Sequence, residues 1–476
     1  MRTALLLTFL APLGCGDRDD TGPDEEADAD TDADTDADTD ADTDADTGPV
    51  HDLSWSLHDT HGSLVTAAWE QDVAGTAEVA YSFDDGEWHT APTVEAEAGA
   101  HTRLIAGIPY GHTAQWRVSV TDSKGTTYTT DGSDITTDGL PDDFPIPSVQ
   151  VSEESLWLPD GRYLLSSVNE KSGGWIQGTY WTFLMDRQGR IVWANETPQS
   201  HWTLFAQVAV TGDHILWDEA TYWADFDRGE ASTVHRTYLD TMIDEIPTPG
   251  LHHAFVQLPD ETLAWGSKNH GGGEALVEQA IDSTDEQVLW TCQYSWPNAG
   301  SYCESNGLFY EESTDSFLYS FYTNNSIVEV DRQSGESLWW AGEVEDGYSF
   351  DPEEAQVDWQ HGISYTDAGT LLLSTEGRNG NNDRVTMVRE YTVDHKQELL
   401  TEIWNRNSEE HATTNGDAWR LSNGNTLHVI GSSGHIKEYA ADGEIVWHLD
   451  ITNENGTGRL LGRGEFIEDL YTLVNP

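Results

Sequence analysis

Basic residues are scarce in this chain: 22 Lys and Arg stand against 86 Asp and Glu, which gives a formal charge of -64. Because phosphate contacts need basic patches, this scarcity argues against a nucleic-acid-binding protein. It also argues against attachment to anionic lipid through basic side chains. Residues 51–476 alone hold 70 acidic and 20 basic residues, so the part expected to fold is acidic in its own right.

Long hydrophobic runs and methionine are also nearly absent. No stretch of 18 apolar residues occurs, so no membrane span is predicted. Only 4 Met accompany 20 Trp, 17 Tyr and 43 Gly. Aromatic residues favour strands and glycines favour turns, so the composition predicts an all-β protein. At about 150 residues per domain, a chain of 476 residues allows two or three domains.

Residues 1–15 have the pattern of a lipoprotein-type signal peptide. Arg2 precedes a short apolar run, residues 4–13, which ends in Gly14-Cys15. Such a run followed by small residues is typical of an export signal. We expect Cys15 to be lipidated and to become the new N-terminus, so that the protein is exported and tethered in the bacterial envelope, periplasmic or at the cell surface. Ordinary secretion, with Cys15 lost or incidental, is the alternative.

Residues 16–50 are an acidic Asp/Ala/Thr linker. From Asp28 to Asp46 every second residue carries a carboxylate, and nothing in the segment builds a core. Self-repulsion then predicts an extended, disordered spacer. Weak Ca²⁺ binding by the alternating carboxylates is a less favoured alternative.

Residues 51–140 change in character and predict a small β-sandwich. Short segments such as residues 64–69, 77–83 and 114–120 alternate between apolar and polar residues, with glycine-containing turns between them. This spacing fits an immunoglobulin- or fibronectin-like sandwich. We see no chemistry in it, and Pro141 and Pro145 close the domain.

Residues 146–476 repeat themselves six times. Each unit of about 40–50 residues reads as four antiparallel strands and ends near a Trp, which predicts a six-bladed β-propeller. Each blade buries its apolar faces only against its neighbours, so the closing Trp residues are expected to be buried between blades. These are Trp193, Trp290, Trp339, Trp404 and Trp447.

Polar residues recur at the start of the first strand of several repeats. Residues 253–262 align without a gap on residues 361–370, which places His253 and His361 at one level. The same register places Asp417 and Asn306 there, and roughly Phe205 and Glu154 in the second and first repeats. Two His, an Asn and acids at one level are too polar for packing, so we expect them to converge on the mouth of a central channel.

Four stretches then resemble the bacterial aryl-sulfate sulfotransferase (arylsulfotransferase, ASST) family. They are residues 135–145, 315–342, 359–378 and 416–427, which include Trp359-Gln-His-Gly362 and Gly416-Asp-Ala-Trp-Arg420. The resemblance implies an exported six-bladed propeller behind a small β-domain. It also implies an enzyme that moves a sulfuryl group from a phenolic sulfate ester to a phenol, with no nucleotide donor and no cofactor.

The family's mechanism implies a histidine that is sulfurylated and then discharged, with further His and Arg residues around the leaving oxygens. On this chain the resemblance implies His411 as the nucleophile. Further catalytic residues would be His361, His253, Arg378 and Asn306. Substrate-binding residues would be Arg384, Arg420, Asp417 and Tyr322.

The fourth repeat departs from the family pattern. It reads Glu304-Ser-Asn-Gly307 where the family carries His-x-Asn-Ser, and Tyr322 stands where an Arg is usual. His253 would have to supply the missing imidazole from a neighbouring blade. A non-catalytic surface propeller that binds a partner at the same mouth is therefore the second hypothesis. A quinone-dependent dehydrogenase is the least favoured of the three hypotheses, because such propellers usually have eight blades and a Ca²⁺ site.

The remaining cysteines predict a disulfide. Cys292 and Cys303 are separated by ten residues in a chain expected to be exported, so we expect them to be bonded. No Cys/His spacing typical of a metal site occurs, so no transition-metal site is predicted. The oligomeric state is left open by the sequence.

Overall fold

The computed structural model describes residues 48–84, 86–172, 178–198, 201–221, 229–270, 273–296 and 303–476. They belong to the second of two units, which spans Gly48–Pro476. The predicted lipidation site Cys15 and most of the acidic linker lie outside the described residues. Within the described ranges, no helix is both long and apolar enough to cross a membrane.

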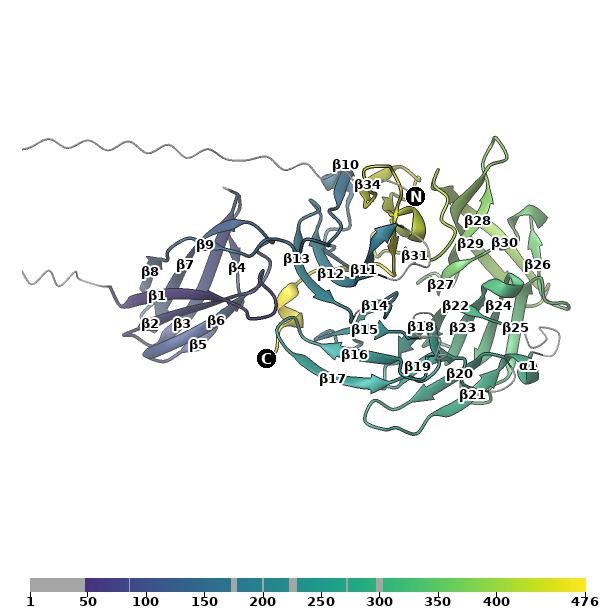
Figure 1. Cartoon of the computed structure of the whole chain (residues 1–476), viewed down its shortest axis with the longest axis horizontal. Coiled ribbons are helices and arrows are strands. Elements are labelled where there is room, and N and C mark those ends of the chain that lie inside the picture. The colour runs from purple at the N-terminus through teal and green to yellow at the C-terminus, as the bar shows by residue number, and fades with distance from the viewer. Residues whose placement is uncertain are drawn as a thin grey trace, which may run out of the picture. The chain divides into compact units, whose positions relative to one another are not determined.

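The first nine strands form two sheets (Figure 1). One has the order β1-β2-β6, and the other has the order β4-β3-β7-β8, with β5 beside β3 and β9 beside β7. Alternate residues of β7 are buried, from Ala114 to Val120, and they share one core with β2 and β3. The bounds are β1 (Val50–Leu57), β2 (Val65–Gln71), β3 (Gly75–Phe83), β4 (His89–Thr90), β5 (Val94–Ala96), β6 (Gly99–Ile105), β7 (Thr113–Asp122), β8 (Thr127–Asp131) and β9 (Ile135–Thr136).

Six further sheets follow among the described residues, each built around three or four strands that are consecutive in the chain. The first holds β11 (Tyr163–Ser172), β12 (Tyr180–Asp186) and β13 (Ile191–Glu196). The second holds β14 (Ala206–Val208), β15 (Ile215–Glu219), β16 (Thr233–Thr237) and β17 (Met242–Pro247). The third holds β18 (Leu251–Gln257), β19 (Leu263–Ser267), β20 (Ala275–Gln279) and β21 (Gln287–Thr291).

The fourth sheet holds β22 (Ser305–Glu311), β23 (Ser316–Phe321), β24 (Ser326–Asp331) and β25 (Ser337–Gly342). The fifth holds β27 (His361–Tyr365), β28 (Leu371–Arg378), β29 (Arg384–Asp394) and β30 (Leu399–Asn407), with β26 (Ser349–Asp351) added parallel to β30. The sixth holds β31 (Asp417–Arg420), β32 (Thr426–Ile430), β33 (His435–Tyr439) and β34 (Ile445–Asp450). The prediction of an all-β protein is confirmed.

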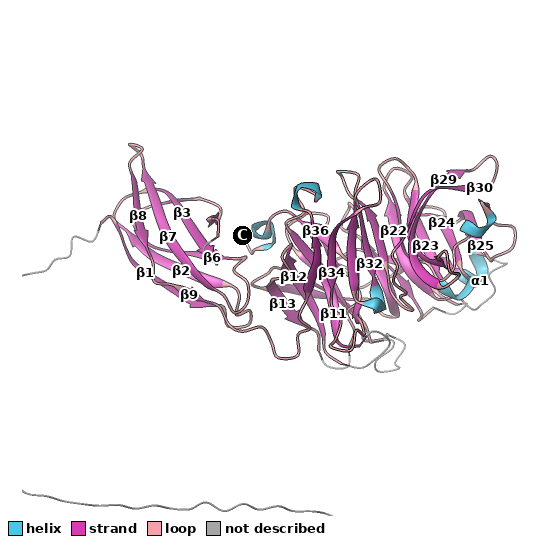
Figure 2. Ribbon diagram, turned by 90° about the horizontal axis from the view of Figure 1, so that it is seen from above, coloured by secondary structure: helices cyan, strands magenta, loops and turns pink. Residues whose placement is uncertain are grey.

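Helices are few and short in the described ranges (Figure 2). They are α1 (Cys292–Ser295) and the 3-10 turns η1 (Glu154–Leu156), η3 (Tyr322–Asn324), η4 (Glu353–Ala355), η5 (Gly431–Ser433) and η6 (Leu470–Leu473). The first strands of neighbouring sheets lie side by side, as β18 with β22, β22 with β27, and β27 with β31. The starts of these strands are therefore gathered in one region.

The two ends of the six-sheet region exchange strands. β10 (Ser148–Ser152) pairs with β34 of the sixth sheet, although the two are far apart in the sequence. β35 (Arg459–Leu461) and β36 (Glu465–Ile467) pair with β11 of the first sheet. The expectation that Glu154 lies on the inner strand of the first repeat is wrong, because Glu154 is in η1 and the C-terminal strands occupy that edge of β11. Repeat patterns locate strands but do not show which sheet a terminal strand joins.

A buried ion pair joins the first and sixth sheets at this exchange. The Arg187 guanidinium follows β12 and bonds to the Glu438 carboxylate on β33, and both side chains are almost fully buried. The guanidinium also lies 4.8 Å from the ring centre of Trp447 and 4.1 Å from that of Phe466. One cation therefore contacts the first sheet, the sixth sheet and the C-terminal strands.

The closing Trp residues are buried as predicted in four of five repeats. Trp193, Trp290, Trp339 and Trp447 are each at most 2% exposed. The prediction is wrong for Trp404, which is half-buried. Its ring is instead covered by the Arg420 guanidinium, whose carbon lies 4.8 Å from the ring centre.

The predicted disulfide is confirmed: Cys292 and Cys303 are bonded, with Cα atoms 6.4 Å apart. Both residues are buried in a core shared by the third and fourth sheets, which includes Trp290 and Phe321. The bond holds Cys303, two residues before β22, against the end of the third sheet.

We expect Arg187→Met to lower the free energy of unfolding by about 3–5 kcal/mol, because it leaves the Glu438 carboxylate buried without its cation. Urea denaturation followed by Trp fluorescence measures this. The double variant R187M/E438M should recover part of the loss, since it removes the unpaired charge. A loss below about 1 kcal/mol in the single variant would contradict the role of this pair in joining the sheets.

Candidate active site

His361 lies at the start of β27, and one of its two ring nitrogens forms a hydrogen bond. Its Nδ1 lies 3.0 Å from the Trp359 carbonyl oxygen. A carbonyl oxygen only accepts, so Nδ1 carries the proton and Nε2 keeps the lone pair. No described residue hydrogen-bonds to Nε2 of His361. Burial lowers the pKa of His361 to about 4, so the ring is uncharged at neutral pH.

His253, at the aligned position in the third sheet, interacts electrostatically with His361. It is on β18 of the third sheet, and its Nδ1 is 3.0 Å from Nδ1 of the adjacent His252. Burial, the charged form of His361 and the Lys268 ammonium lower the pKa of His253 to about 3. The structure therefore brings two uncharged imidazoles together from the third and fifth sheets.

A small central hollow opens beside His361. Its lining includes Phe205, Asn306, His361, Asn415, Gly416 and Arg463. Asn306 donates from Nδ2 to the Gln360 carbonyl oxygen over 2.5 Å and accepts from the Ser320 hydroxyl over 2.9 Å. Its amide therefore holds the peptide that precedes His361, which makes it a positioning residue for that ring.

Gln360, the first residue of the Gln-His pair, faces away into the fourth sheet. Its Nε2 donates to Ser320 Oγ and to the carbonyl oxygens of Phe321 and Ser326, at 3.0–3.1 Å. The side chain is fully buried. Gln360 therefore anchors the start of β27 against the fourth sheet while His361 points to the hollow.

Asp417 and Arg463 form the other side of the hollow. Arg463 Nε is 3.8 Å from Asp417 Oδ2, and Arg463 Nη1 donates to Gln207 Oε1 over 3.0 Å. The guanidinium also lies 4.3 Å from the ring centre of Trp419. Burial raises the pKa of Asp417 to about 6, and Arg463 opposes that rise. Arg463 thus brings a positive charge to the hollow that holds His361.

Tyr322 lies between the two histidine-bearing segments. Its ring is edge-on to that of His253, with centroids 5.9 Å apart, and edge-on to that of Trp359, with centroids 5.3 Å apart. Its hydroxyl donates to the Glu304 carboxylate. At the position where the resemblance led us to expect an Arg, Tyr322 instead supplies an aromatic ring and a hydroxyl group that donates to the Glu304 carboxylate.

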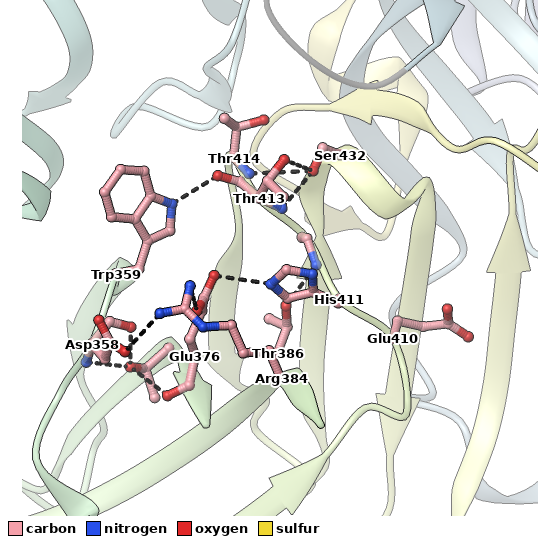
Figure 3. Close-up of polar contacts among 12 residues, drawn as sticks. Asp358, Trp359, Glu376, Arg384, Thr386, Glu410, His411, Thr413, Thr414 and Ser432 are labelled. Atoms are coloured by element: carbon pink, nitrogen blue, oxygen red, sulfur yellow. Dashed lines mark hydrogen bonds and ion pairs between the residues drawn. The ribbon is translucent and has the colours of Figure 1, made fainter. Parts of the chain in front are cut away.

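Two further predicted residues, His411 and Arg384, lie in a second group, the rim cluster of Asp358, Glu376, Arg384 and His411 (Figure 3). His411 Nε2 is 3.0 Å from Glu376 Oε1, and Arg384 Nη1 is 2.8 Å from Glu376 Oε2. Arg384 Nη2 is also 3.7 Å from Asp358 Oδ2. Figure 3 shows Glu376 between His411 and Arg384. This carboxylate orients the predicted nucleophile and neutralises one predicted substrate-binding cation.

A cleft of about 310 Å³ lies beside the rim cluster and is lined in part by Glu376, Arg378 and Arg384. Arg378 donates from Nη1 to the Asn382 carbonyl oxygen over 3.2 Å and is exposed. No described contact joins His411, Arg378 or Arg384 directly to His253 or His361. The loop that follows His411 does approach the centre, because Trp359 Nε1 donates to the Thr413 carbonyl oxygen over 2.7 Å.

Arg420 lies apart from both groups. It is at the far end of β31 from Asp417, where it forms an ion pair with Glu390 and covers Trp404. We therefore do not place it at the substrate.

One group of possible metal ligands occurs in the described part of the chain. His51, Asp52 and Glu70 lie together on β1 and β2, far in the sequence from the histidines described above. Asp52 and Glu70 are exposed. The group has no connection to the central hollow.

Sequence reasoning missed Arg463 and the role of Glu376. Arg463 belongs to no repeat, but it stands between Gly462 and Gly464. A Cβ on Gly462 would lie 2.1 Å from Ser167 Oγ and 2.2 Å from the Leu204 carbonyl oxygen, so only glycine lets this segment reach the first and second sheets. The sequence feature that could have identified Arg463 is the glycine on each side of it, in a segment beyond the last repeat.

Residues 300–454 match the family model of the arylsulfotransferases (ASST). The predicted resemblance is confirmed over these 155 of 476 residues. The match supports a sulfotransferase enzyme. It includes Asn306, His361 and the rim cluster, whereas His253 and Arg463 lie outside it. No curated protein matches the chain.

Several solved structures are distantly similar. The Cps50 (Swd1) β-propeller domain of Myceliophteria thermophila is 12% identical, with 64% of this chain and 86% of that chain covered and a TM-score of 0.38. Virginiamycin B lyase of Staphylococcus aureus is 14% identical, with 72% and 95% covered and a TM-score of 0.31. Hydrazine synthase of Kuenenia stuttgartiensis is 11% identical, with 65% and 81% covered and a TM-score of 0.37. These similarities are too distant to inform the site.

We expect the kcat/KM for an aryl sulfate to hold nearly constant as the pH falls from 8 to about 5, and then to decline with a midpoint near 4. Burial holds the pKa of His361 down, so its ring stays neutral at pH values well below the ordinary pKa of 6.5. A pH series of initial rates on the wild-type protein measures this. A midpoint near 6.5 would instead point to an imidazole with an ordinary pKa as the nucleophile.

Proposed function

We propose that this protein is an aryl-sulfate sulfotransferase whose chemistry takes place at the central hollow. It would move a sulfuryl group from a phenolic sulfate ester to a phenol through a histidine intermediate, with no nucleotide donor. The donor is a small organic anion, so it needs a local positive charge in a chain that is acidic overall. At physiological ionic strength charges beyond about 8 Å are screened, so the local groups decide.

The observation that carries the proposal is the fixed tautomer of His361. Its Nδ1–H bond to the Trp359 carbonyl oxygen leaves the Nε2 lone pair available beside a hollow that also holds Arg463. A neutral, oriented imidazole is a nucleophile near neutral pH. Trp359 is itself held by its indole bond to Thr413 and by a backbone bond to Asn325 Oδ1 over 2.9 Å. The ring is therefore positioned before any substrate arrives.

The reaction would proceed in two balanced steps. His361 Nε2 attacks sulfur, an N–S bond forms, and the S–O bond to the aryl group breaks with its electron pair left on the phenolate. An acceptor phenol then attacks the same sulfur, an O–S bond forms, and the N–S bond breaks. The acceptor's proton passes to solvent, and His361 returns to its neutral form.

The surrounding groups match the charges that develop. Arg463 would hold the negatively charged sulfuryl oxygens. Neutral His253 adds an imidazole without repelling the sulfurylated ring of His361. His411 is the competing nucleophile, because Glu376 orients its ring. It is favoured less, since the described contacts place it with the rim cluster and Glu376 also holds Arg384.

We propose further that the six sheets are the blades of one closed β-propeller. Support comes from the side-by-side first strands and from the exchange in which β10 completes the sixth sheet and β35 and β36 complete the first. Each terminal strand then closes the ring by pairing with the opposite end of the chain. In that arrangement the hollow lies near the axis.

We also propose that the protein is exported and tethered to the bacterial envelope. The support is the sequence pattern before Cys15 and the acidic spacer after it. A lipid on Cys15 would hold the protein at a membrane, and residues 16–50 would separate the folded part from it.

We expect His361→Ala to lower sulfuryl transfer from para-nitrophenyl sulfate to phenol by at least about 10³-fold, because it removes the atom that accepts sulfur. Nitrophenolate release followed by absorbance measures the rate. His395→Ala is the matched control, since His395 is exposed and outside both groups of residues. His411→Ala should cost far less than His361→Ala.

Mass spectrometry of the protein quenched during turnover locates the intermediate. A mass increase of one SO₃ on the peptide with His361 is expected. The same increase on the peptide with His411 would move the chemistry to the rim cluster. No transfer and no modified histidine in the wild-type protein would leave the chain as a non-catalytic binding propeller.

A further inference from the structure

Asn415 lines the central hollow in a backbone conformation that few side chains adopt. It lies in the loop between His411 and β31, two residues before Asp417. Its φ is +57°, in the left-handed region that favours glycine and, among other residues, asparagine. Asn415 is only 8% exposed and lines the same hollow as His361 and Arg463. A buried amide therefore forms part of the wall of the proposed reaction centre.

The backbone around Asn415 is packed on two sides. A Cβ on Gly431, in η5, would lie 2.4 Å from the Asn415 carbonyl oxygen, so η5 packs directly against this peptide. A Cβ on Gly416 would lie 3.4 Å from the His361 Cβ, which is a van der Waals contact. The loop therefore holds Asn415 beside the strand that begins with His361.

One hydrogen bond fixes the orientation of the Asn415 amide. Its Nδ2 donates to the Leu461 carbonyl oxygen over 3.2 Å. A carbonyl oxygen only accepts, so the amide nitrogen faces Leu461 and Oδ1 faces another direction. No residue in the described ranges donates to Oδ1, and the second N–H of Nδ2 has no described acceptor. Leu461 precedes Arg463 by two residues, so one short segment both orients this amide and brings the cation to the hollow.

The amide oxygen can distinguish the two substrates of the proposed reaction. An amide oxygen accepts hydrogen bonds and donates none. A phenolic sulfate ester such as phenyl sulfate presents only acceptor oxygens, whereas a phenol carries one O–H donor. A buried acceptor without a donor is costly, so the hydroxyl-bearing substrate gains the most by meeting Oδ1. The hollow thus has a cation suited to the sulfuryl oxygens in Arg463 and an acceptor suited to a hydroxyl in Asn415.

We propose that Asn415 Oδ1 binds the hydroxyl of the acceptor phenol. This rests on the proposed sulfotransferase function and names the group that selects its second substrate. The phenol O–H donates to Oδ1, which leaves a lone pair of the phenol oxygen for attack on the sulfur held by His361. The O–S bond forms, the N–S bond breaks with its electron pair returned to His361 Nε2, and the phenol proton passes to solvent. Asn415 orients the hydroxyl and takes no proton itself.

The test removes the amide and keeps the backbone. Glycine adopts a positive φ without strain, so Asn415→Gly retains the left-handed conformation. In a two-step transfer, the kcat/KM of each substrate reports its own half-reaction. The kcat/KM for phenol should fall about tenfold, because the hydrogen bond to its hydroxyl is lost, while that for para-nitrophenyl sulfate should change by less than about twofold. Initial rates over a grid of both concentrations give the two constants.

Asn382→Gly is the matched control. Asn382 is exposed, has a φ of +68° and does not line the hollow, so the same substitution there should alter neither constant. If Asn415 served only its backbone conformation, Asn415→Gly would behave as wild type, and that result would overturn the proposal. Equal losses for both substrates, or a loss for the sulfate ester alone, would overturn it as well.

Binding of phenol and of anisole, its methyl ether, tests the site without turnover. Anisole keeps the ring and the oxygen but has no O–H donor. Calorimetric titration of the wild-type protein should show phenol bound about tenfold more tightly than anisole, and Asn415→Gly should bind the two alike. Equal binding of both compounds by the wild-type protein would refute the site, even if the variant does not fold. Absence of transfer together with a preference for phenol that depends on Asn415 would refute the sulfotransferase but not the hydroxyl site.

Discussion

The buried pair of Arg187 and Glu438 is the contact on which the arrangement of the six sheets depends. Two charges removed from water stabilise a fold only when each fully satisfies the other. Here Glu438 also accepts from the Leu158 N–H over 2.9 Å and from Asn425 Nδ2 over 2.6 Å, so both of its oxygens are used. The pair lies where the first sheet, the sixth sheet and the C-terminal strands meet. That meeting brings Arg463, from the end of the chain, to the hollow of His361.

Basic residues are few in this protein. Most of those named here form ion pairs that stabilise the fold, and few lie near the candidate site. Arg187 joins sheets, Arg332 pairs with Glu278 and Asp260, and Arg389 pairs with Glu402. Arg463 instead lines the hollow beside His361, with its Nε 3.8 Å from Asp417 Oδ2. A chain with a formal charge of -64 can still bind a small anion if a few cations are held close to one another and screened from the rest.

Burial sets the chemistry of the histidines. Burial lowers the pKa values of His253, His361 and His428, so all three rings are uncharged at neutral pH, but their surroundings differ. His428 on β32 of the sixth sheet is buried, and its Nε2 is 3.0 Å from Ser374 Oγ on β28 of the fifth sheet, where it packs. His361 has the same lowered pKa but opens onto a hollow, with its tautomer set by a backbone carbonyl. The environment therefore makes one imidazole a core residue and leaves the other with an Nε2 lone pair beside a hollow.

Local pattern in the sequence was enough to predict the all-β fold, the strands of the six repeats and the bonded cysteines. Each of these depends on alternation, turn residues or spacing that neighbouring residues carry. The burial of Trp404 was predicted wrongly, because its cover, Arg420, comes from another sheet. The place of Glu154 was wrong because terminal strands pair across the whole length of the chain. The meeting of His411 and Arg384 at Glu376, and the arrival of Arg463 at the hollow beside His361, were decided only by tertiary structure, since side chains from different parts of the chain meet through folding and not through sequence distance.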